Sequence, residues 1–125
     1  MTEHLSAKRI VVVEDDGLTS QSLRDYFKDH NAVLTYPSAE ALLERPQDLN
    51  QIDLFIIDYR LPGMDGVELF EKLKLENANA RFICISGEIS MDLASRINEI
   101  GFDALILKPF DFAILEQNIA SLTEA

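Results

Sequence analysis

Four places in the sequence carry side chains that could take part in one reaction. Each lies directly after a short apolar run, and the four are the acidic run Glu14-Asp15-Asp16, then Asp58, Ser86 and Lys108. A site built from a few carboxylate oxygens and water suits Mg²⁺ better than zinc. A carboxylate can attack phosphorus, while a metal ion, a lysine and a hydroxyl bind the phosphoryl oxygens. Together these residue types predict phosphoryl transfer to a carboxylate.

Each of these residues also has an ordinary structural explanation when it is taken alone. Acidic residues before a helix complement the helix dipole, aspartates form turns, and a single lysine is a solvated charge. Electrostatics favours a common site. Two carboxylates about 5 Å apart repel by about 3 kcal/mol at an effective dielectric near 20, so three of them require a cation. Lys108 supplies one positive charge, and Mg²⁺ is the predicted source of the rest.

The apolar runs that precede these residues are predicted β-strands. They are continuous and rich in Ile and Val, as strands covered on both faces are. Their bounds are residues 10–13, 54–57, 82–85 and 104–107, with a weaker candidate at 32–36. Apolar residues at helical spacing separate the runs, as at Leu93, Ile97 and Ile100. Suitable capping residues precede four of the predicted helices: Ser38, Asp65, Ser90 and Asp111.

Strands that alternate with helices form a parallel sheet through right-handed crossovers, with helices on both faces. The predicted fold class is therefore α/β, a doubly wound five-stranded parallel sheet with five helices. In such sheets, ligands bind beyond the carboxyl ends of the strands. The predicted fold thus brings the acidic run, Asp58, Ser86 and Lys108 to one edge of the sheet.

The composition limits the class of protein further. The 125 residues fit a single domain, and 22 acidic against 11 basic residues give a net charge of −11, which disfavours direct binding of nucleic acid. One cysteine excludes an intramolecular disulfide and fits a reducing cytosol. No apolar run approaches the about 20 residues of a membrane span, and residues 1–9 lack a signal-peptide core. We expect a cytoplasmic protein without membrane association, with residues 1–8 a loosely ordered extension of one domain, 1–125.

The motifs that carry the candidate residues resemble a known family. From Arg9 to about Leu122 the chain is similar to the response regulator receiver domain of bacterial two-component signalling, on the stretches VVVEDDG, LFIIDYRLPGMDG, ICISGE and LILKPF. The resemblance implies a flavodoxin-like fold with strand order 2-1-3-4-5. It also implies a signalling module that catalyses only its own phosphorylation and dephosphorylation, rather than an enzyme.

The resemblance assigns roles to the acidic residues. Asp58 would be the phosphoacceptor, and its donor would be a phosphohistidine on a sensor histidine kinase or a phosphotransfer protein. Asp15 and Asp58 would bind Mg²⁺ together with the backbone carbonyl of Arg60. Glu14 would act on the ion through water, and Asp16 is expected to cap the following helix.

The resemblance also assigns roles to the residues of the last two strands. Ser86 would hydrogen-bond the phosphoryl group, and Lys108 would pair with it from a cis Lys108–Pro109 peptide. The family often has an aromatic switch residue three positions before the lysine, where this chain has Leu105, so a ring-based switch is in doubt. Gly87 stands where alanine is more usual, which favours a more mobile loop.

Further expectations concern regulation, the core and the output of the chain. Arg60 and Glu88 occupy positions that tune dephosphorylation in the family, and we expect their side chains to form an ion pair across the mouth of the site. Cys84 is expected to be a small core residue and Tyr59 to pack beside the site. The expected output is a downstream protein or effector domain, with a phosphorylation-dependent homodimer through the fourth and fifth helices. The chain is expected to be either a stand-alone regulator or part of a longer one.

Two other classes of protein share part of this pattern. Phosphatases of the haloacid dehalogenase type also use an aspartyl phosphate and Mg²⁺, but they need a second aspartate two residues after the nucleophile, where this chain has Arg60. A pseudo-receiver would keep the fold as an interaction module without phosphorylation. Such modules usually lose the acceptor or the acids, which are present here, and only Leu105 favours this alternative.

Overall fold

The computed structural model describes residues 8–29, 31–44, 49–77, 79–88 and 90–123. Residues 1–7 of the predicted N-terminal extension, residues 1–8, lie outside the described residues. Its last residue, Lys8, is described, and the Lys8 N–H donates to Asn31 Oδ1 at 2.9 Å. The strands are β1 Arg9–Val13, β2 Ala32–Tyr36, β3 Leu54–Asp58, β4 Arg81–Ser86 and β5 Ala104–Leu107. The helices are α1 Gly17–Phe27, α2 Ala39–Leu43, α3 Gly66–Glu76, α4 Met91–Ile100 and α5 Phe112–Thr123, with a 3₁₀ turn at Leu49–Gln51.

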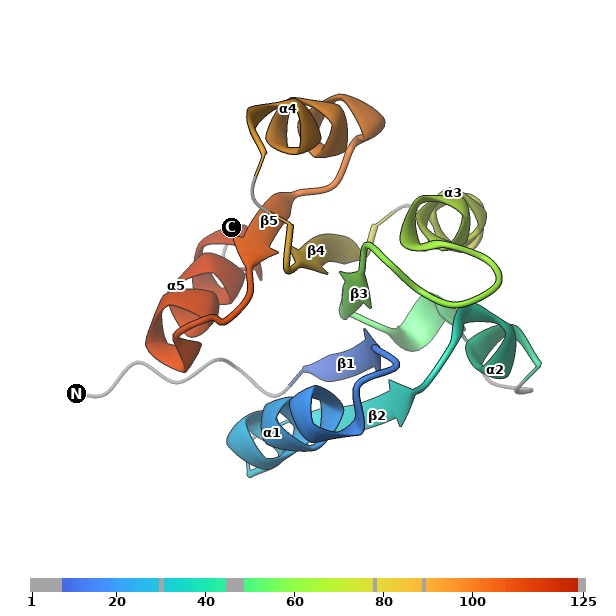
Figure 1. The fold of residues 1–125 in the computed structure, drawn as a ribbon. Helices are drawn as coiled ribbons and strands as arrows, with labels where there is room; N and C mark the ends of the chain where they lie inside the picture. The colour runs from blue at the N-terminus through green and yellow to red at the C-terminus, as the bar shows by residue number, and fades with distance from the viewer. Residues whose placement is uncertain (1–7, 30, 45–48, 78, 89, 124–125) are drawn as a thin grey trace.

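The five strands form one sheet in the order β2-β1-β3-β4-β5, and every neighbouring pair is parallel (Figure 1). This arrangement confirms the predicted fold class and strand order. The register places Val13 of β1 beside Ile57 of β3, and Asp58 beside Ile85 of β4. Because the strands are parallel, the residues that follow them lie at the same edge of the sheet.

Helices cover both faces of the sheet, with α1 and α5 on one face and α2, α3 and α4 on the other (Figure 1). Successive strand residues point to opposite faces, so Val11 and Val13 pack toward α2–α4 while Ile10 and Val12 pack toward α1 and α5. All five residues of β3 are buried. Double coverage therefore explains why the predicted strands are continuous apolar runs rather than alternating ones.

Side chains cap the helices at positions that the sequence marks. The side chains of Ser38 and Ser90 accept from backbone N–H groups in the first turns of α2 and α4. Asp65 forms a capping box with Glu68 at the start of α3, and Asp111 Oδ1 accepts from the Ala113 N–H at 2.7 Å. These contacts confirm the four predicted caps. Within the described ranges, no helix is both long and apolar enough to cross a membrane.

Candidate metal centre

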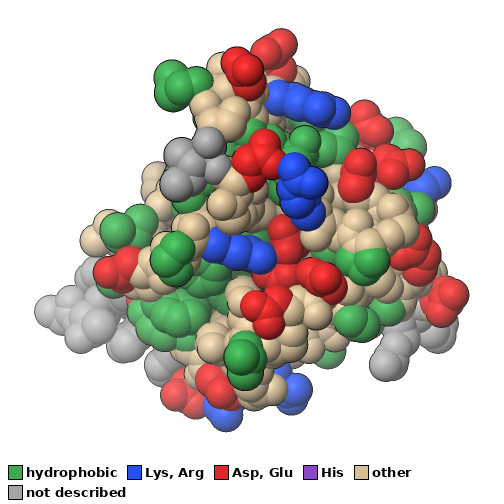
Figure 2. Space-filling model, in the orientation of Figure 1, with side chains coloured by type: hydrophobic (Ala, Val, Ile, Leu, Met, Phe, Trp, Pro, Cys, Tyr) green, Lys and Arg blue, Asp and Glu red, His purple; other side chains and the backbone are tan. Residues whose placement is uncertain are grey.

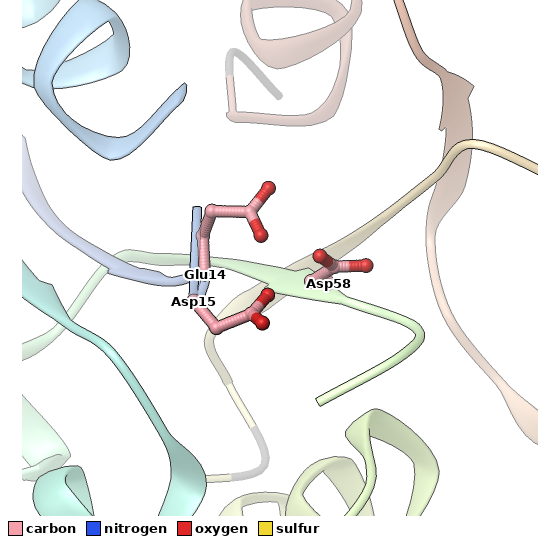
Figure 3. A group of neighbouring side chains, drawn as sticks. All are labelled: Glu14, Asp15 and Asp58. Atoms are coloured by element: carbon pink, nitrogen blue, oxygen red, sulfur yellow. The ribbon is translucent and has the colours of Figure 1, made fainter. Parts of the chain in front are cut away.

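Three carboxylates meet where β1 and β3 end. Glu14 and Asp15 follow β1 directly, and Asp58 is the last residue of β3. One carboxylate oxygen from each lies within 4.8 Å of those from the other two, and the three side chains extend into the same space (Figure 3). Glu14 and Asp58 are only 1 % and 5 % exposed, whereas Asp15 faces solvent. The sequence prediction that these carboxylates form one cluster is confirmed.

Lys108 places its ammonium group between two of these carboxylates. Its Nζ lies 2.9 Å from Asp58 Oδ2 and 2.6 Å from Glu14 Oε1. The Lys108 N–H donates to the Ser86 carbonyl at 2.7 Å, and the Lys108–Pro109 peptide is cis, as predicted. Partial burial alone would lower the pKa of Lys108, but its contacts with Glu14 and Asp58 outweigh this effect and raise it. Figure 2 shows acidic side chains gathered beside a basic one on this face of the molecule.

The buried position of Glu14 changes its affinity for protons. Burial is the largest cause that raises the pKa of Glu14 to about 8, and the hydrogen bond and negative charge of Asp58 add to it. Lys108 and the Asp16 N–H, which donates to Glu14 Oε2 at 3.2 Å, act in the opposite direction. The buried carboxylate of Glu14 therefore binds a proton more tightly than that of an exposed glutamate does.

The raised pKa of Glu14 predicts a pH-dependent stability for the chain without metal. In the folded chain Glu14 keeps its proton up to about pH 8, whereas the unfolded chain loses it near pH 4.5. Between these values the folded state binds more protons, so the free energy of unfolding should fall as the pH rises. Urea unfolding in EDTA at several pH values measures this slope. Glu14→Gln should flatten it, and an equal slope in wild type and variant would contradict the assignment.

The residues present fit a hard divalent cation. Glu14 Oε1 is buried and lies 2.6 Å from Lys108 Nζ. The two atoms form an ion pair, but their angles do not suit a hydrogen bond, so this oxygen has no hydrogen-bond partner. When a bound cation displaces the proton of Glu14, three ionised carboxylates and one ammonium group leave two negative charges, and all the candidate ligands are oxygens. Hard cations such as Mg²⁺ prefer such ligands. The Arg60 N–H donates to Asp58 Oδ1 at 3.1 Å, which holds Arg60 beside the cluster, and the role of its carbonyl as a ligand stays a prediction.

Ser86 ends β4, at the same edge of the sheet as the carboxylates. It lies one residue beyond Ile85, which pairs with Asp58, and its side chain is buried. The Ser86 Oγ accepts from the Glu88 N–H at 3.0 Å. The carboxylate of Glu88 in turn lies 2.6 Å from the Arg60 guanidinium, so the expected ion pair forms. Ser86 is thus linked to the loop after β3 through Glu88.

The loop between β3 and α3 depends on two glycines. Gly66 begins α3, and a β carbon there would overlap the backbone carbonyl of Asp58. Its N–H donates to the Tyr59 carbonyl at 3.3 Å. Gly63 has a φ of +72°, in the left-handed region that favours glycine. Sequence reasoning did not identify these constraints, because the PGMDG pattern marks a turn but not which backbone atoms lie against it.

Asp16 and Cys84 take the structural places expected for them, and the structure also places Leu105. The side chain of Asp16 caps α1 by accepting from the Leu18 N–H at 3.1 Å. Cys84 is buried in β4, and burial raises the pKa of its thiol to about 12. Leu105 is half-buried and packs against the core beneath α2–α4. Cys84 is therefore a core residue, and the switch role discussed for Leu105 stays a prediction.

The sheet is parallel and has the order β2-β1-β3-β4-β5, with a cluster of acidic residues and a lysine at the carboxyl ends of its strands. These features define a class of α/β protein with a candidate cation site. Comparison with protein families matches residues 10–120 to the response regulator receiver domain. The chain belongs to this family, whose members are typically non-catalytic modules of two-component signalling. Its acidic cluster is typical of a receiver Mg²⁺ site.

Individual relatives agree with the family assignment. The chain is 28 % identical over 111 residues to sporulation initiation phosphotransferase F of Bacillus subtilis. The aligned residues cover 83 % of this chain and 84 % of that protein. The chain is also 26 % identical over 111 residues to a cyclic di-GMP phosphodiesterase of Thermotoga maritima. The aligned residues cover 88 % of this chain but only 29 % of that longer protein. The BeF₃-activated receiver domain of DrrB from Thermotoga maritima has the same fold, with a TM-score of 0.87 at 21 % identity over 95 % of this chain and 99 % of that one.

Proposed function

We propose that the chain is the phosphoacceptor of a two-component phosphorelay, and that Asp58 receives the phosphoryl group. The donor is a phosphohistidine on a sensor histidine kinase or a phosphotransfer protein, because receiver domains generally partner with histidine kinases. The observation that carries the proposal is the position of the Lys108 ammonium group between Asp58 and Glu14, beside Asp15. The ammonium group would pair directly with the negative charge of a phosphoryl group, and the carboxylates would do so through a bound Mg²⁺ ion.

The transfer forms one bond and breaks another. An oxygen of Asp58 bonds to phosphorus as the bond from phosphorus to the donor imidazole breaks, and the imidazole nitrogen keeps the electron pair. Bound Mg²⁺ would neutralise charge on the phosphoryl oxygens. Lys108 pairs with one of these oxygens and Ser86 donates a hydrogen bond to another. The Arg60 N–H keeps Asp58 oriented through its Oδ1.

Incubation with acetyl phosphate tests this function without a partner protein. In the presence of Mg²⁺ the intact mass of the wild type should rise by one phosphoryl group, and EDTA should prevent the gain. No gain at saturating Mg²⁺ would contradict the proposal and favour the pseudo-receiver alternative. Steady release of phosphate from a generic phosphomonoester would instead favour the phosphatase alternative, although Arg60 stands where that class needs an acid.

Its relatives suggest how such a phosphorylated chain acts. One relative is named a phosphotransferase of sporulation, and others are named transcriptional regulators, such as FixJ of Azorhizobium caulinodans, of which the chain spans 49 %. We propose that phosphorylation changes a protein-binding surface, read in the cytoplasm by a downstream protein or effector domain. A homodimer through α4, β5 and α5 belongs to the same proposal, and Leu107 and Ile114 expose apolar surface on these elements.

The ion pair between Arg60 and Glu88 predicts a change in the lifetime of the phosphorylated state. The pair joins the loops after β3 and β4 near Asp58 and Ser86, so Arg60→Ala should let water reach the aspartyl phosphate more easily. The Arg60 side chain is 76 % exposed, and exposed pairs are weak, so the lifetime should fall by only about twofold to fivefold. Loss of the phosphoryl mass with time measures it. Arg96→Ala on α4 is the control, and an unchanged lifetime in Arg60→Ala would discard the tuning role.

A further inference from the structure

A carboxylate outside the metal centre contacts the middle of the loop between β3 and α3. Glu40, in the first turn of α2, accepts a hydrogen bond from the Met64 N–H at 2.8 Å across 24 residues of sequence. This bond, together with one from its own backbone N–H, lowers the pKa of Glu40. The contact is therefore a charge-assisted hydrogen bond between α2 and the loop.

Gly63 shows how closely the carboxylate approaches the loop. A β carbon at this position would lie 2.6 Å from Glu40 Oε2, so a side chain there would displace the carboxylate from the turn. The turn has Pro62 followed by Gly63 with a φ of +72°, which are the residues preferred at the centre of a type II turn. The turn is thus shaped by its own sequence, and Glu40 ties it to α2.

This turn lies between two segments that bear directly on the metal centre. On its N-terminal side the Arg60 N–H contacts Asp58, and on its C-terminal side the Gly66 N–H contacts the Tyr59 carbonyl. The side chain of Met64 also packs against the core beneath α2–α4. A displacement of the turn would therefore move both segments relative to Asp58.

We propose that Glu40 is a positioning residue of the metal centre. By binding the Met64 N–H it fixes the turn, and the fixed turn keeps the backbone of Arg60 beside Asp58 in the geometry that Mg²⁺ needs. Mg²⁺ demands nearly ideal octahedral coordination, so small displacements of a ligand weaken its binding. The inference rests on the proposed function, but its metal-binding part is measured without phosphorylation.

Calorimetric titration with Mg²⁺ tests the inference on the whole chain. Glu40→Ala should weaken Mg²⁺ binding by about fivefold to tenfold, because one charge-assisted hydrogen bond is lost. Glu40→Gln keeps an oxygen acceptor for the Met64 N–H and should remain within about twofold of the wild type. Glu44→Ala, at an exposed position that ends the same helix, is the matched control and should bind as the wild type does. With acetyl phosphate, Glu40→Ala should raise the Mg²⁺ concentration for half-maximal rate and leave the rate at saturation unchanged.

Two results would overturn the role of Glu40. The first is Mg²⁺ binding by Glu40→Ala within twofold of the wild type. The second is equal weakening in Glu40→Gln and Glu40→Ala, because the negative charge alone would then attract the ion from a distance. If the wild type gains no phosphoryl group, the proposed function fails, and the calorimetric comparison still decides on Glu40. Because Glu40 is exposed, its truncation creates no cavity that would unfold the chain.

Discussion

Replacing Asp58 by asparagine should abolish the Mg²⁺-dependent gain of a phosphoryl group from acetyl phosphate. The amide keeps the size of the carboxylate and an oxygen acceptor for the Arg60 N–H, but it is not a nucleophile. The rate should therefore fall by about three orders of magnitude or more, below detection by intact mass. The variant should remain folded, because the change removes a buried negative charge that faces Glu14.

The matched control for this variant is Asp16→Asn, at the neighbouring acidic position. Asp16 caps α1, and asparagine caps helices as well as aspartate does, so this variant should be phosphorylated at the rate of the wild type. A phosphoryl gain in Asp58→Asn would show that another residue is the acceptor. Equal loss in both variants would show that negative charge near the site, rather than Asp58 itself, is what the reaction needs.

Replacing Lys108 by methionine should have the second largest effect. Methionine has a similar length without the charge, so Glu14 and Asp58 would face each other without the ammonium group that contacts both. The phosphorylation rate at saturating Mg²⁺ should fall by about a hundredfold, because a cation that stabilises the transferring group is lost. In EDTA the free energy of unfolding should also fall, by about 1–3 kcal/mol for a partly buried ion pair that loses one partner.

Lys28→Met provides the control for the loss of a lysine that is paired with an aspartate. The Lys28 Nζ lies 3.3 Å from Asp25, and both side chains are exposed on the surface, so neither rate nor stability should change appreciably. Intact-mass spectra of samples quenched at successive times give the phosphorylation rates, and urea titrations give the free energies of unfolding. Phosphorylation of Lys108→Met within a few-fold of the wild type would contradict the role of the lysine.

The strands and the carboxylate cluster could be predicted from sequence because the signals are local. Each strand is a continuous apolar run, and the observed strands extend the predicted runs by at most one residue at either end, as at Arg9 and Asp58. The topology of a parallel sheet then brings the strand ends together without knowledge of any individual contact. The caps Ser38 and Ser90 are also local, since each bonds to a residue three positions further along.

The contacts that could not be predicted join side chains to distant backbone atoms. The bond from the Met64 N–H to Glu40 leaves no mark in the sequence, because any residue except proline offers an N–H group. Asn77 likewise donates to the carbonyls of Leu49 and Ile52, and these bonds hold the 3₁₀ turn that the sequence pattern does not indicate. Such contacts are determined by how the helices and strands pack together, and the periodic pattern of apolar residues does not indicate this packing.

The ammonium group of Lys108 would also determine the balance of charges in the pocket if Asp58 is phosphorylated as proposed. With all three carboxylates ionised, the pocket carries a formal charge of −2, which one divalent ion cancels completely. An aspartyl phosphate carries about one more negative charge than the carboxylate it replaces. With the ion bound, the phosphorylated pocket would end about one charge from neutrality. Without the ion Glu14 keeps its proton up to about pH 8, and the same modification would still leave about two uncompensated charges. A net charge near zero before and after phosphorylation would let the proposed reaction proceed without a large electrostatic cost to the stability of the fold.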